Sequence, residues 1–102
     1  ENRILGMDCN PYLGIAASLA CGLLGLIEKR QPKPEMKTDA YHTGNLPRSL
    51  REALDLFNEA EEMQNLLHPK FSEIYLAVKN LEHAEYLHVI SPWEREHLLL
   101  NV

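Results

Sequence analysis

The chain has 102 residues, of which 45% are hydrophobic and 25% are charged, and this is the composition of one soluble domain. Ten Lys and Arg residues are scattered among fifteen Asp and Glu residues, for a net charge of -5. A nucleic-acid partner is excluded, because such partners demand a basic patch. Cys9 and Cys21 form no CxxC pair and lie near or inside an apolar stretch. We therefore expect reduced, buried thiols and a cytoplasmic protein.

The chain is organised around an uncharged stretch of 17 residues that begins at Pro11 and ends at Ile27. Asn10 is a good N-cap, and Pro11 takes the first helical position, where its missing N–H costs nothing. Because apolar residues run all the way round this predicted helix, it should be buried on most sides. The rest of so short a chain can hardly wrap it completely. We therefore expect either self-association or a missing remainder, and the start at Glu1 rather than Met suggests a piece of a longer protein.

The other elements follow in order along the chain. Residues 1–5 are strand-like, and residues 31–47 have no periodic pattern and are predicted to be a long surface loop. Apolar spacing and capping signals at Ser49 and Ser91 predict the remaining helices, over residues 49–57, 58–67 and 69–88, with a last short one that ends between residues 98 and 100. The fold class is therefore mostly α, with about five helices around the central apolar helix and a short strand-like N-terminus.

Most candidate site residues in the sequence have a simple structural interpretation. The five histidines have neither the i, i+4 spacing of a helix-borne metal pair nor a nearby cysteine, so surface or capping roles are favoured; they are His42, His68, His83, His88 and His97. Glu1 and Arg3 are different, because a carboxylate and a guanidinium two apart on a strand end can present a metal ligand and an anion clamp to one site. By spacing alone, this signal is weak.

The context of Glu1 and Arg3 resembles the glutamine synthetase family. The segment ENRILGMDCNPYLGIAASLACGLLGLIEK is similar to the family's Glu-x-Arg strand, short loop and Asn-Pro-Tyr-Leu helix start. The later segments LPRSLREALDLF, KFSEIYLAVKNLEHAEY and SPWEREHLLL are similar to the closing helices of the family, in the same order. The resemblance covers essentially all of the chain.

The resemblance implies that residues 1–102 are the C-terminal segment of an α+β glutamine synthetase-type catalytic domain. Glu1 takes the position of a metal ligand, and Arg3 takes that of the arginine that contacts glutamate and its acyl phosphate. The full-length protein would use Mg²⁺ or Mn²⁺ and ATP to join glutamate to ammonia through γ-glutamyl phosphate. It would be a cytoplasmic homo-oligomer. The fragment alone should bind no cofactor and be inactive.

Three alternatives remain open at this stage. The short loop around Tyr41 does not match the adenylylation motif of some bacterial members, and together with the SPWEREHLLL ending it favours the γ-glutamylpolyamine ligase branch, which joins glutamate to an amine such as putrescine. A free-standing helical interaction module, without enzymatic activity, is the second alternative. A membrane-spanning peptide is the third, because 17 uncharged residues are at the short edge of a span. The charged, proline-rich tail after Ile27 argues against it.

Overall fold

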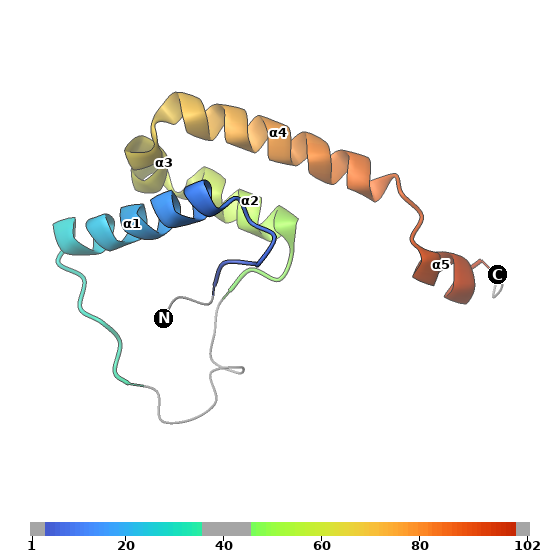
Figure 1. Ribbon diagram of the computed structural model, residues 1–102, viewed down its shortest axis with the longest axis horizontal. Coiled ribbons are helices and arrows are strands. Elements are labelled where there is room, and N and C mark those ends of the chain that lie inside the picture. The colour runs from blue at the N-terminus through green and yellow to red at the C-terminus, as the bar shows by residue number, and fades with distance from the viewer. Residues whose placement is uncertain (1–3, 36–45, 100–102) are drawn as a thin grey trace.

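The computed structural model describes residues 4–35 and 46–99, and helices dominate both ranges (Figure 1). The five helices are α1 (Pro11–Ile27), α2 (Leu50–Glu59), α3 (Glu61–Leu67), α4 (Pro69–Leu87) and α5 (Pro92–His97). The predicted mostly-α fold with five helices is confirmed. Ile4 and Leu5 are not in a strand, because the described residues contain no other strand with which they could pair. Residues 1–3 of the strand-like segment lie outside the described ranges.

Helix α1 ends in a Schellman motif, which explains why it stops after Ile27. Lys29 takes the left-handed conformation with φ 53°. Its N–H donates to the Leu26 carbonyl at 3.2 Å, and the Arg30 N–H donates to the Gly25 carbonyl at 2.9 Å. These two bonds satisfy carbonyls that the helix end would otherwise leave unpaired. Glycine is the usual residue at the left-handed position, so a lysine there is held at some conformational cost.

The sequence predicted a boundary between two helices at Asn58, and the structure places it two residues later. Helix α2 continues to Glu59, and Ala60 leaves the helical conformation with ψ 70° before α3 begins. The Gln64 side chain stabilises this break, because its amide Nε2 donates to the carbonyls of Phe57 at 2.8 Å and Asn58 at 2.9 Å. A side chain of α3 thus caps the end of α2, a contact that local periodicity cannot predict.

Replacing Gln64 by leucine should therefore lower the free energy of unfolding by about 1 to 2 kcal/mol, since the two carbonyls lose their donor and one of them is partly buried. The midpoint of urea unfolding, followed by circular dichroism, measures this loss. Gln31→Leu is the matched control, because Gln31 is exposed and lies outside the helices. Equal midpoints for the two variants would show that the Gln64 side chain does not stabilise the break between α2 and α3.

The single residue His68 joins α3 to α4. Its backbone has φ 80° and ψ 123°, and its imidazole Nδ1 accepts from the Lys70 N–H at 3.3 Å, which caps α4 ahead of Pro69. Ser72 in the first turn of α4 is fully buried, and its hydroxyl donates to the Gln64 carbonyl at 3.3 Å. The expected capping role of a histidine is confirmed here.

The helices form an open assembly rather than a closed bundle (Figure 1). Helices α2 and α4 run in opposite directions side by side, with α3 at the end where they join, and these three pack against one another. Helix α1 packs on α3 but makes no helix contact with α2 or α4, and no described helix contacts α5. The radius of gyration is 17.5 Å, compared with about 13 Å for a compact domain of this length.

The central helix is much less buried than the sequence suggested. Among the described residues, Ala20 and Leu54 are the only buried hydrophobic side chains. Large side chains of α1 stay in solvent, with exposed fractions of 70% for Leu19 and 77% for Leu26. The expectation that the remaining helices cannot wrap α1 completely is thus confirmed for the described residues. No helix in the described ranges is long and apolar enough to cross a membrane.

Helix α5 begins with the predicted capping box. The Ser91 N–H donates to the Glu94 carboxylate at 2.7 Å, and the Ser91 hydroxyl accepts from the Glu94 N–H at 3.1 Å. The backbone N–H of Ser91, and then its side chain, lower the pKa of Glu94 from its ordinary value. A carboxyl with a lowered pKa stabilises the folded form above its unfolded pKa, and this contribution is lost as pH falls through the folded pKa.

Acidification below the ordinary glutamate pKa of about 4.3 should therefore loosen the first turn of α5. The amide proton of Ser91, followed by NMR against pH, should titrate with a midpoint below that value. Glu94→Gln should remove the titration of this proton, while the control Glu96→Gln, on the same helix, should leave it in place. A Ser91 amide that still titrates in Glu94→Gln would contradict the assignment.

Candidate functional site

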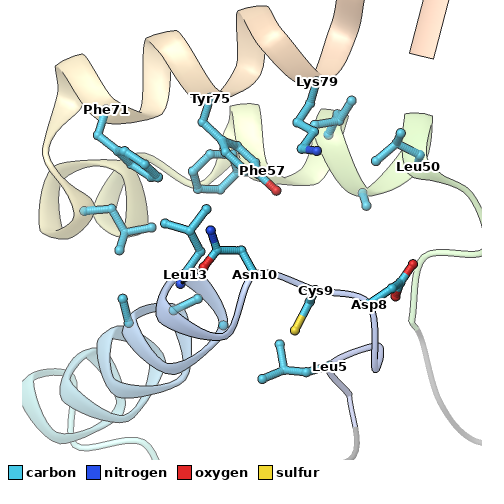
Figure 2. A pocket seen from close by; sticks show the side chains of 16 residues that line it. Leu5, Asp8, Cys9, Asn10, Leu13, Leu50, Phe57, Phe71, Tyr75 and Lys79 are labelled. Carbon is cyan, nitrogen blue, oxygen red and sulfur yellow. Dashed lines mark hydrogen bonds between the residues drawn. The ribbon is translucent and has the colours of Figure 1, made fainter. Parts of the chain in front are cut away.

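An open groove of about 700 Å³ separates α1 from the pair formed by α2 and α4 (Figure 2). Its walls are mainly apolar and come from the four helices α1 to α4 and the segment that precedes α1. The main lining residues are Leu5, Leu13, Ala17, Leu50, Ala53, Leu54, Phe57, Leu67, Phe71 and Tyr75. Helix α4 thus contributes Phe71 and Tyr75 to this groove, beside the apolar residues of α2.

Three aromatic rings form the wall between α2 and α4. The rings of Phe57 and Tyr75 meet edge to face with centroids 6.0 Å apart, and Phe71 stacks on Tyr75 at 5.8 Å. Such pairs add to the stabilisation that burial of their area provides. Lys79 lies over the Tyr75 ring at 6.0 Å, and its Nζ donates to the Glu82 carboxylate at 2.6 Å. The hydrogen bond to Glu82 raises the pKa of Lys79, so this lysine stays charged.

The segment before α1 lies against the start of that helix at Gly14. A β-carbon at position 14 would lie 3.0 Å from Leu5 Cδ1 and 3.4 Å from the Cys9 sulfur. Glycine therefore allows residues 5–9 to pack closely on α1. Nothing comparable lies near Gly22, which faces open space in the described structure. Close approach of another segment to α1 thus occurs at Gly14 and not at Gly22.

The two cysteines are free thiols, but the prediction that they are buried is wrong. Cys9 lines the groove and Cys21 lies on α1, and both are exposed. Cys21 is exposed because the other described helices leave much of α1 uncovered, whereas Cys9 lies in the segment before α1 at the open groove. The reduced state of the two thiols stays a prediction.

Two of the polar side chains that line the groove, Asn10 and Lys79, are engaged in contacts within the chain. Asn10 caps α1, since its side-chain oxygen accepts from the N–H groups of Tyr12 at 3.0 Å and Leu13 at 3.4 Å. Lys79 is paired with Glu82, as described above. In the parts of the chain that the structure describes, no three His, Cys, Asp or Glu side chains come together as a possible metal site. The described residues that line the groove therefore do not fit a metal centre.

The residues predicted to carry the chemistry, Glu1 and Arg3, lie outside the described residues, and so do Tyr41 and His42. The structure describes the element that follows Glu1 and Arg3, namely the capped start of α1 at Asn10 and Pro11. The groove was not predicted from the sequence. Phe57 and Tyr75 lie on two different predicted helices, and no local signal indicated that an open groove would lie between them and α1.

The described residues form a helical structure in which apolar side chains line an open groove. The chain belongs to the glutamine synthetase family, because its residues 1–98 match the sequence model of the glutamine synthetase catalytic domain. The resemblance of the Glu-x-Arg and Asn-Pro-Tyr-Leu segments is thereby confirmed at the level of the family.

Individual relatives agree with this assignment. The chain is 34% identical to type-1 glutamine synthetase 2 of Dictyostelium discoideum, over 97% of this chain and 20% of the relative. It is 38% identical to glutamate–isopropylamine ligase of a Pseudomonas species, over 92% of this chain and 22% of the relative. It is 35% identical to glutamine synthetase of Archaeoglobus fulgidus, over 92% of this chain and 21% of the relative. The chain thus spans about a fifth of the length of these relatives.

Proposed function

We propose that residues 1–102 form the C-terminal segment of the catalytic domain of a glutamine synthetase-type ligase, which joins the γ-carboxylate of glutamate to ammonia. The observation that carries this proposal is the family match over residues 1–98, which includes the Glu-x-Arg segment. The exposed face of α1 supports it, because an uncharged helix whose large apolar side chains stay exposed in the described structure is suited to packing on the rest of a larger domain.

The proposed reaction has two steps. An oxygen of the glutamate γ-carboxylate attacks the terminal phosphorus of ATP, and ADP leaves, which produces γ-glutamyl phosphate. The lone pair of ammonia then attacks the γ-carbonyl carbon, the C–O bond to phosphate breaks, and the nitrogen gives up a proton. Phosphate is thus exchanged for an amide nitrogen, and the free energy comes from ATP. The protein's main task is to hold and neutralise negative charge during both steps.

Arg3 is proposed to hold the glutamate side of this reaction. A guanidinium offers paired N–H donors to a carboxylate, and the same donors can stay on the acyl phosphate as its charge develops. Glu1 is proposed as one of several carboxylate ligands of Mg²⁺ or Mn²⁺, an ion that would neutralise phosphate charge when bound. The other ligands would have to come from elsewhere in a full-length protein, because the described residues contain no cluster that could complete the set.

An alkylamine is the alternative acceptor. It is supported by the relative named glutamate–isopropylamine ligase, which is 38% identical over 92% of this chain, and a second relative is named glutamate–methylamine ligase. A polyamine such as putrescine is the related alternative that the sequence suggested. The proposed full-length protein would be a cytoplasmic homo-oligomer, and the free thiols of Cys9 and Cys21 are compatible with that compartment.

The test is an acceptor panel with the full-length protein. Release of ADP from ATP and Mg²⁺ should require glutamate and an acceptor. We expect kcat/KM for ammonia to exceed the values for isopropylamine, methylamine and putrescine by roughly 10-fold or more, the selectivity that a pocket of fixed size can provide. The control omits glutamate. A preference for one of the amines would establish the alternative, and no glutamate-dependent ADP release with any acceptor would overturn the ligase proposal.

A further inference from the structure

We draw no further inference here: the strongest candidate, the apolar groove between α1, α2 and α4 (Figure 2), carries no proposal because nothing in the structure shows what covers it.

Discussion

The isolated chain should self-associate through α1, and changing Leu19 and Leu26 together to glutamate should abolish the association. These two side chains are seven residues apart on the same helix and are 70% and 77% exposed. Burying a leucine side chain at an interface stabilises the complex by about 1.5 to 3 kcal/mol. Losing two of them should therefore raise the dissociation constant by roughly 100-fold or more. Sedimentation equilibrium over micromolar concentrations measures the change.

The matched control for this experiment is the double change of Leu81 and Leu87 to glutamate. Both residues lie on α4 and are 64% and 68% exposed, so the control adds the same charge to a similar apolar surface on another helix. The control should associate like the unchanged chain. A strictly monomeric unchanged chain at high micromolar concentration, or equal disruption by both double variants, would show that α1 is not the interface.

In the full-length protein, Arg3→Ala and Glu1→Ala should impair catalysis in different ways. Removing the guanidinium should reduce kcat/KM for glutamate by roughly 100- to 1,000-fold, or about 2.7 to 4 kcal/mol, by analogy with deletion of one preorganised charge-stabilising donor. The dependence of the rate on Mg²⁺ should stay near normal in that variant. Removing the carboxylate should instead raise the Mg²⁺ concentration required for half of the maximal rate.

Steady-state rates against glutamate and against Mg²⁺, measured for both variants, distinguish these effects. Arg30→Ala is the control for loss of an arginine, because Arg30 pairs with Glu28 on the surface just beyond α1. Circular dichroism confirms that each variant is folded. Near-normal activity with unchanged Mg²⁺ dependence in both Arg3→Ala and Glu1→Ala would show that neither residue belongs to the active site, despite the family membership.

The helix boundaries could be predicted where the signals are local. Asn10, Ser49 and Ser91 were identified as N-caps from the residues beside them, and all three side chains accept hydrogen bonds from the first turns of their helices. The break at Ala60 was misplaced because Gln64, on the following helix, supplies the donors that stabilise it. A local sequence pattern can predict a capping residue next to the helix end. It cannot predict a capping side chain that a different helix supplies.

Burial and the candidate site were harder to predict, for a related reason. The apolar character of α1 is a local property, but the burial of a helix depends on its neighbouring elements, and here Leu19 and Leu26 stay 70% and 77% exposed. The groove depends on the placement of α1 relative to Phe57 and Tyr75, residues that lie at least 30 positions beyond the end of α1. Glu1 and Arg3 were assigned through the family resemblance, and their roles stay predictions.

The close contact at Gly14 limits which residues position 14 can accept during evolution. Any β-carbon there presses on Leu5, and Leu5 is two residues from Arg3 along the chain. A larger residue at position 14 would thus require the Leu5 side chain to shift, two residues from the proposed glutamate-binding arginine. Gly22 carries no such constraint within the described structure. Replacements at position 14 are then limited by how far Leu5 can move, whereas replacements at position 22 are not.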